Sequence, residues 1–311
     1  MPPIPRHLLD CSFYLYPSVK SAQDGDASGG SGFLAHVPSE HEGFIHLYAI
    51  TNKHVVDGGC RFLRLNTNDG KLDVISSEPD DWTTHPEGDD LAIMPIETID
   101  ENFKWLSVGT ENFINQNTFD DYSIGPGDEA FLIGRLVTAA GHQRNTPVVR
   151  FGNISMMADP AEPVVLEARK QEAFLVECRS LSGFSGSPVF IRTTQTYRDG
   201  HVPKAFQPKP MPPAQPGTPT ATITHQLVSG TFGPWLLGID CAHVPLWKPV
   251  YESDCKTKTP EGYRIEANTG IACVIPAWRI LDLLNGGEFV KARKRDDART
   301  AKRKPNAAVS D

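Results

Sequence analysis

The sequence lacks any segment that would carry the chain across a membrane. It starts with Met1, Pro2 and Pro3, and no basic start followed by a long apolar run is present. The sequence therefore predicts neither a signal peptide nor a membrane span. We expect the protein to be cytoplasmic.

Cysteine is scarce and has no paired spacing. The six cysteines are Cys11, Cys60, Cys178, Cys241, Cys255 and Cys273. In a reducing cytoplasm such residues stay free thiols. Cys241 and His243 form a lone Cys-x-His pattern with no second ligand pair at the spacing of a zinc site, so we predict no metal.

Charged residues make up only 22% of the chain, which also contains 26 Gly and 26 Pro. This composition predicts a globular protein rich in turns and excludes a simple helical bundle. A length of 311 residues suits two medium domains or one two-lobed unit.

Basic residues gather at the C-terminus of an otherwise acidic chain. The net charge is -8, yet residues 291–311 hold eight Lys or Arg against three Asp. A polyanion-binding arm is one interpretation, but a terminal run of this kind is more often a solvated tail. We predict a disordered tail at 291–311 and no specific nucleic-acid partner.

Short apolar runs separated by turn-forming residues predict an all-β fold. The predicted strands are 33–37, 44–51, 60–65, 91–96, 129–134, 147–154, 173–178, 187–191, 226–230, 235–241 and 270–275. The last apolar segment has helical spacing instead. Pro276 begins it and Gly286 and Gly287 follow it, which predicts a short C-terminal helix at 276–285.

Two insertions interrupt the strand pattern. Residues 193–224 contain seven prolines, which remove backbone donors, so we expect a long exposed loop. Residues 245–268 form the second insertion. Together with the basic tail, these insertions offer surfaces to a regulatory protein partner.

A serine lies between glycines in segment 183–189, Gly-Phe-Ser-Gly-Ser-Pro-Val. A tight turn here would present the hydroxyl of Ser185 and direct the N–H groups of Gly183 and Ser185 to one point. Taken alone, such a loop is more often an ordinary turn than a nucleophile.

Two further residues support a catalytic interpretation of the serine loop. His54 follows an apolar strand, and Asp90 stands directly before the apolar residues 91–93. Each is commonplace alone. With Ser185 they supply the base, the orienting acid and the nucleophile that peptide hydrolysis by a serine requires.

In the order His, Asp, Ser, these segments resemble the trypsin-like serine proteases. Segment 51–54 (Thr-Asn-Lys-His) matches the family's Thr-Ala-x-His, and 90–93 (Asp-Leu-Ala-Ile) matches its Asp-Ile-Ala-Leu. Segment 183–188 matches Gly-Asp-Ser-Gly-Gly-Pro. Supporting matches at 30–34, 127–134 and 237–239 extend the resemblance from about residue 28 to residue 285.

The resemblance implies an all-β fold of two antiparallel six-stranded β-barrels. The barrels are expected at 8–112 and 120–275, the second with both insertions, and the helix 276–285 follows them. The triad implied is His54, Asp90 and Ser185, with an oxyanion hole from Gly183 and Ser185 and no cofactor. Asp89 is the rival of Asp90, but the family's acid directly precedes the apolar pair, so we expect Asp89 to face solvent.

The sequence departs from secreted members of the family. Phe184 replaces the acidic residue that binds a freed N-terminus, and Val55 replaces the cysteine after the histidine. The resemblance is therefore to bacterial intracellular, stand-alone trypsin-like peptidase domains. Cys241 stands where many relatives place a serine near the triad Asp.

The resemblance also locates a specificity pocket. Its expected lining is Arg179, Ser180, Cys241, Ala242, His243 and Gly270. Arg179 with His243 would hold an acidic side chain. Because strand residues alternate faces, Arg179 facing solvent is the alternative, and small or medium apolar side chains would then be preferred.

We predict a serine endopeptidase that acts on protein or peptide substrates. The alternatives are a protease-fold module that mainly binds or regulates a partner, and an esterase that uses the same acyl chemistry. Since no triad member is missing, the sequence favours the peptidase.

Overall fold

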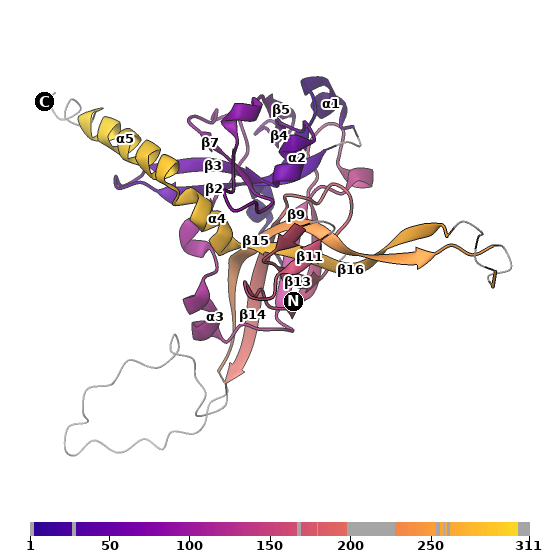
Figure 1. The fold of residues 1–311 in the computed structure, drawn as a ribbon. Coiled ribbons are helices and arrows are strands. Elements are labelled where there is room, and N and C mark those ends of the chain that lie inside the picture. Colours follow the sequence, from indigo (N-terminus) through magenta and orange to yellow (C-terminus); the bar gives the residue numbers. More distant parts are fainter. Residues whose placement is uncertain are drawn as a thin grey trace, which may run out of the picture.

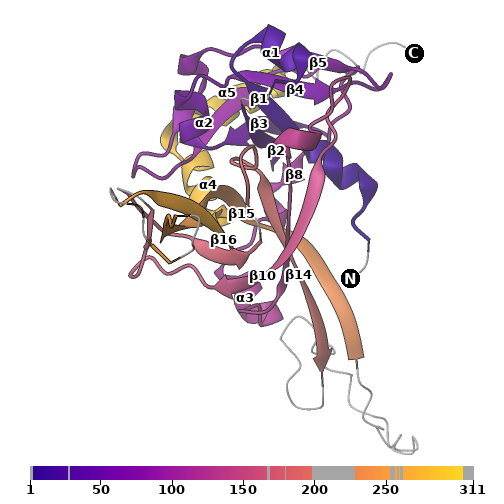
Figure 2. The same ribbon diagram turned by 90° about the vertical axis from the view of Figure 1, so that its right-hand side faces the viewer.

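The computed structural model describes residues 3–26, 29–166, 169–178, 180–197, 228–252, 256–257, 259 and 262–303. Most elements are β-strands, with few helices and two of them at the C-terminal end. Figures 1 and 2 show the strands in two groups, one above the other. The predicted all-β class and the C-terminal helix are therefore confirmed in outline.

The first group of strands forms an open eight-stranded sheet. Its order is β5-β4-β1-β2-β3-β7-β6, with β8 pairing with β2. The bounds are β1 Ser12–Tyr16, β2 Gly30–Pro38, β3 Ile45–Thr51, β4 Phe62–Asn66, β5 Leu72–Ile75, β6 Thr83–Thr84, β7 Ala92–Ile96 and β8 Val108–Gly109.

The expectation of a closed barrel in the first half is wrong. Among the described strands, β5 and β6 end the sheet without pairing with each other. Strands β6 and β8 have only two residues each. Such short strands provide too few backbone groups for a ladder that closes the ring.

The centre of the first sheet is buried on both faces, as the inner residues of strand β3 show. In β3, Leu47 and Ala49 pack into one cluster with Trp82, whereas Tyr48 and Ile50 pack into the larger core. Alternate side chains of a strand point to opposite faces. Both sets are therefore apolar, because neither face is open to water.

The second group of strands forms a closed barrel of six antiparallel strands, in the order β10-β13-β16-β15-β14-β9. One of the two predicted barrels is thus present. The bounds are β9 Glu129–Gly134, β10 Val148–Met156, β13 Phe174–Glu177, β14 Pro188–Tyr197, β15 Val228–Pro249 and β16 Arg264–Pro276. A separate hairpin is made by β11 Val164–Leu166 and β12 Arg169–Gln171.

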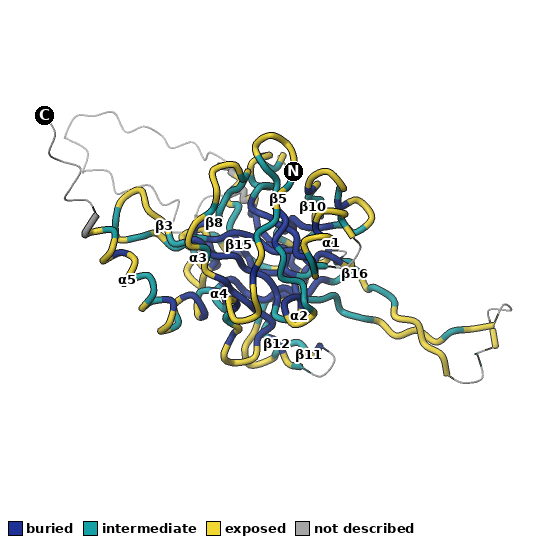
Figure 3. Tube along the Cα trace, turned by 90° about the horizontal axis from the view of Figure 1, so that it is seen from above, coloured by how far each residue is buried: buried dark blue, intermediate teal, exposed yellow. Residues whose placement is uncertain are grey.

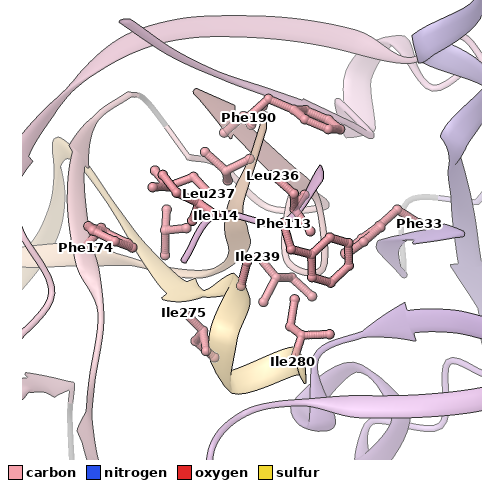
Figure 4. Close-up of a cluster of buried hydrophobic side chains, with 14 of the residues drawn as sticks. Phe33, Phe113, Ile114, Phe174, Phe190, Leu236, Leu237, Ile239, Ile275 and Ile280 are labelled. Carbon is pink, nitrogen blue, oxygen red and sulfur yellow. The ribbon is translucent and has the colours of Figure 1, made fainter. Parts of the chain in front are cut away.

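One hydrophobic core joins the sheet and the barrel. Figure 4 shows Phe33 of β2 beside Phe113, and also shows side chains of the barrel strands and of the C-terminal helix. The connecting segment pairs with the barrel directly, since the N–H of Ile114 donates to the carbonyl of Leu236 over 2.9 Å. The catalytic candidates of the two halves are therefore held on one packed body.

Two barrel strands continue beyond the barrel as a two-stranded arm (Figure 1). Strands β15 and β16 stay paired from Gly238↔Pro276 out to Pro249↔Arg264. The second predicted insertion, 245–268, lies largely on this arm. Of the first insertion, β14 contains residues up to Tyr197, and residues 198–224 lie outside the described residues.

The C-terminal region contains two helices, α4 Ala277–Leu284 and α5 Gly287–Arg303. Helix α4 begins after Pro276 and buries Ala277, Ile280, Leu283 and Leu284. This spacing places them on one helix face. The structure differs from the predicted disordered tail at 291–311, because the residues up to Arg303 belong to helix α5. Residues 304–311 lie outside the described residues.

Helix α5 is attached to the first sheet through its middle. The guanidinium of Arg293 donates to the hydroxyl of Tyr48 on β3 over 3.2 Å, and Asp297 accepts from Ser39 Oγ over 2.5 Å. Much of its remaining surface is exposed (Figure 3). Tertiary contacts at these points explain why a charged segment is ordered as a helix.

The remaining short elements lie in connections. They are η1 Arg6–Cys11, α1 Val19–Asp24, α2 Lys53–Asp57, η2 Pro79–Asp81, η3 Thr110–Asn112, α3 Gln116–Tyr122 and η4 Val137–Ala139. Within the described ranges, no helix has the length and apolar character needed to cross a bilayer.

Candidate active site

His54 is presented by the end of a buried strand. Strand β3 ends at Thr51, and the short helix α2 begins at Lys53, so the chain turns just before the histidine. Asn52 Nδ2 donates to the carbonyl of Asp90 over 2.9 Å, which ties this turn to the segment before β7. The His54 side chain is 44% exposed.

Asp90 binds His54 with both carboxylate oxygens. His54 Nδ1 lies 2.6 Å from Asp90 Oδ2, and the His54 backbone N–H donates to Oδ1 over 2.8 Å. The Asp90 side chain is only 1% exposed. This double contact fixes the orientation of the imidazole, so the predicted partnership of these two residues is present in the geometry.

The pKa of Asp90 is lowered. Burial acts to raise it, but the hydrogen bond and charge of His54, followed by the charge of Arg169, outweigh burial. The carboxylate is therefore ionised at neutral pH and can only accept hydrogen bonds. It follows that Nδ1 of His54 carries a proton, which leaves Nε2 as the basic nitrogen of the neutral ring.

Asp89 does not face solvent, contrary to the expectation from sequence. It is 7% exposed. Its Oδ2 accepts from Arg279 Nε over 2.6 Å, and its Oδ1 accepts from Gln171 Nε2 over 2.9 Å. Arg279 lies 190 positions further along the chain, on α4. Burial is tolerated because the charge is paired.

The serine loop is held from behind by Ser31 of β2. The Ser31 N–H donates to the carbonyl of Ser185 over 2.8 Å, and Ser31 Oγ donates to the carbonyl of Gly183 over 2.7 Å. Gly183 and Gly186 have φ values of 96° and 89°. A Cβ on Gly186 would lie 1.9 Å from the carbonyl oxygen of Ser31. Both the backbone angle and the space thus require glycine at position 186.

The structure brings the Ser185 loop and the His54 helix to either side of Gly30. A Cβ on Gly30 would lie 2.9 Å from both Cγ atoms of Val55, and 3.2 Å from the carbonyl oxygen of Ser185. Among the described residues, however, no hydrogen bond joins Ser185 Oγ to the ring of His54. In unliganded enzymes this bond is often long and tightens when substrate binds.

Two backbone donors of the serine loop are left available. The neighbouring N–H groups are used: Phe184 donates to Leu181 and Gly186 donates to Asp240. No described group accepts from the N–H of Gly183 or Ser185. These are the two groups that the sequence predicts for the oxyanion hole.

The predicted specificity residues only partly lie together. Ser180 is buried and donates to Asp240 Oδ2 over 2.6 Å. Arg179 lies outside the described residues. His243 contacts an acid of the protein itself, since its Nε2 lies 2.6 Å from Glu266 Oε1 on β16. Glu266 thus engages the histidine that was expected to assist Arg179.

The other predicted pocket residues lie on the same two strands. Cys241 is buried and its thiol donates to the carbonyl of Cys273 over 3.3 Å. Ala242 is partly exposed on β15. Gly270 lies on β16 with φ 83° and open space where a Cβ would stand. None of the five described cysteines forms a disulfide.

Sequence reasoning missed three residues of the site. Arg169 and Gln171 come from the β11–β12 hairpin and contact the segment of Asp90. Asp240 lies directly behind the serine loop, where its carbonyl accepts from Gly186 and its N–H donates to Ser187. No local motif marks them, because each reaches the site through pairing with residues far away in the sequence.

The described residues include no group of three or more His, Cys, Asp or Glu arranged to hold a metal ion.

Comparison with known proteins gives weak similarities. No protein-family profile and no curated protein match the chain. Among solved structures, the MamO protease domain from Magnetospirillum magneticum (apo form) is 14% identical with a TM-score of 0.48, covering 90% of this chain and 98% of that one. An atomic-resolution structure of HBP is 8% identical with a TM-score of 0.44, covering 91% and 93%. Similarities of this size assign the chain to no family.

Proposed function

We infer that this protein is a trypsin-like serine endopeptidase with His54, Asp90 and Ser185 as its triad. The observation that carries the proposal is the contact of Asp90 with both the backbone and the ring of His54, at 2.8 and 2.6 Å. A buried, ionised carboxylate that orients an exposed imidazole is the arrangement that general-base catalysis requires.

The proposed reaction begins at Ser185. Nε2 of His54 removes the proton of Ser185 Oγ, which attacks the scissile carbonyl. The N–H groups of Gly183 and Ser185 donate to the oxyanion that forms. The imidazolium then protonates the leaving amine, and an acyl-enzyme remains on Ser185. Water, activated by His54, hydrolyses this ester and returns the enzyme to its starting state.

Covalent labelling tests the proposal. A fluorophosphonate probe should add one adduct per molecule, and peptide mass spectrometry should locate it on Ser185, because phosphonylation needs the same activated hydroxyl as peptide cleavage. Ser185→Ala should abolish the adduct. The matched control is Ser182→Ala, which removes an exposed hydroxyl from the same loop and should label like the parent.

The labelling experiment also separates the alternatives. Labelling together with cleavage of denatured protein substrates supports the endopeptidase, whereas labelling with hydrolysis of esters alone supports the esterase. A folded protein that is not labelled at any pH from about 5 to about 9, the range over which a histidine base titrates, contradicts both enzyme proposals.

One observation favours the second candidate, a protease-fold module that binds a protein partner. The β15–β16 arm exposes large apolar side chains, with Leu246 at 48%, Trp247 at 55% and Ile265 at 60%. Exposed apolar groups of this size on one element are typical of contact surfaces. An unlabelled protein would leave this candidate as the preferred function.

A further inference from the structure

The β11–β12 hairpin has one face toward the body of the protein. Val164 and Leu166 on β11 pair with Gln171 and Arg169 on β12. Leu166 is 5% exposed and joins the main core. Because strand side chains alternate, the residues paired with Leu166 and Val164 share their face, while Lys170 points to the exposed side. The hairpin is therefore anchored by apolar contacts and presents Arg169 and Gln171 inward.

Both inward polar residues contact the acid segment. Arg169 Nη2 donates to Asp90 Oδ2 over 2.9 Å. Gln171 Oε1 accepts from the Asp90 N–H over 3.3 Å, and Gln171 Nε2 donates to Asp89 Oδ1 over 2.9 Å. The hairpin thus binds both the side chain and the backbone of Asp90.

The oxygen that Arg169 binds is the one that binds the imidazole. Asp90 Oδ2 lies 2.6 Å from His54 Nδ1 and 2.9 Å from Arg169 Nη2. A guanidinium stays charged at every accessible pH. It therefore offsets part of the negative charge that would otherwise stabilise a protonated His54.

The other groups around His54 do not replace this charge. Lys53 and Asp57 on α2 pair with each other, and Asp89 is paired with Arg279 of α4. On the barrel side, the hydrogen bond with Cys273 and burial raise the pKa of the Cys241 thiol, so it is uncharged.

Cys241 does not compete with Arg169 for the carboxylate of Asp90. Its thiol donates to the carbonyl of Cys273, not to Asp90. In the described part of the chain, Arg169 is the one charged group besides His54 that pairs with Asp90.

We propose that Arg169 is a positioning residue that orients Asp90 and sets the basicity of His54. By sharing Asp90 Oδ2 with the imidazole, it keeps His54 a weaker base than an unshared carboxylate would make it. The role in catalysis rests on the proposed function, but the effect on His54 does not.

The titration of His54 in the full chain tests the proposal. NMR of protein labelled in its histidine rings gives the midpoint, and the signal that disappears in His54→Gln identifies the residue. In Arg169→Met and Arg169→Gln the midpoint should rise by ~0.5 to 1 pH unit, a value reduced for the partial exposure of Arg169. Arg169→Lys, which keeps the charge, should restore most of the parent value.

Lys170→Met is the matched control, since it removes the same charge from the adjacent residue on the exposed face. Its midpoint should stay within ~0.2 unit of the parent. A midpoint in Arg169→Gln that equals or falls below that of the parent overturns the proposal. If thermal unfolding shows that Arg169→Met is not folded, the NMR midpoints of Arg169→Gln and Arg169→Lys test the proposal.

Peptidase activity measured in parallel distinguishes failure of the proposed function from failure of the proposed link between Arg169 and His54. If the parent cleaves peptides, the acidic limb of its kcat/KM profile should move upward with the NMR midpoint in Arg169→Gln. If the parent cleaves nothing and binds no fluorophosphonate, the proposed function fails, while the NMR shift still supports or overturns the link between Arg169 and His54.

Discussion

Ser185→Ala and His54→Ala are each expected to lower kcat for a fluorogenic peptide by ~10⁴-fold or more. Without His54, Ser185 Oγ keeps its proton, and without Ser185, His54 has no hydroxyl to activate. The double variant should therefore lose less than ~10-fold beyond either single variant. Steady-state kinetics near neutral pH, at several enzyme concentrations, measures all three.

The control for this prediction must separate chemistry from folding. Both variants should unfold at temperatures close to that of the parent, because Ser185 is only partly buried and the His54 side chain is 44% exposed. Ser182→Ala should retain full turnover. If the losses of the two single variants multiply in the double variant, Ser185 and His54 do not act as one unit, and the proposed triad is contradicted.

The sequence could predict the residues whose signals are local. His54 follows strand β3, and Asp90 precedes the apolar residues that start β7, as the motifs indicate. The glycines around Ser185 are required by positive φ and by the approach of Ser31. A pattern within a few residues is sufficient in each of these places, because the local backbone itself positions the group.

The sequence could not predict features that depend on distant pairing. The first sheet stays open because β6 and β8 are very short, and strand length of that kind is set by tertiary contacts. The burial of Asp89 depends on Arg279, and the surroundings of Asp90 depend on Arg169. Strands β11 and β12 have three residues each, too few for an alternation pattern to stand out.

Asp240 is a second buried acid beside the serine loop, and it has no cationic partner among the described residues. It is 0% exposed, its Oδ2 accepts from Ser180 Oγ, and its Oδ1 has no hydrogen-bond partner. Burial raises the pKa of Asp240 to about 8, against the opposing hydrogen bond from Ser180. The protonated form is therefore the one that the fold accommodates.

A raised pKa in the folded state makes stability depend on pH with a definite sign. The folded protein binds this proton more tightly than the unfolded chain, whose Asp titrates near 3.8. The contribution of Asp240 is fully present below about pH 4 and is lost as pH rises toward 8. Carboxylates with lowered pKa values, such as Asp90 and Asp297, act in the opposite direction. Only a comparison of variants isolates Asp240.

Asp240→Asn should therefore be about as stable as the parent at about pH 4 and more stable at about pH 8. A shift of about four pKa units corresponds to roughly 4 to 6 kcal/mol at the upper limit, and we expect the free energy of unfolding at the higher pH to rise by ~2 kcal/mol or more. Urea unfolding at about pH 4, 6 and 8 measures the difference. Asp120→Asn, at an exposed site on α3, should follow the parent at each pH.

Because an amide must still find a partner for its second donor, Asp240→Leu provides an independent neutral replacement. If neither neutral variant gains stability relative to the parent between about pH 4 and 8, the prediction is contradicted. Asp240 is then ionised in the folded state, and the carboxylate behind the serine loop must have a cationic partner.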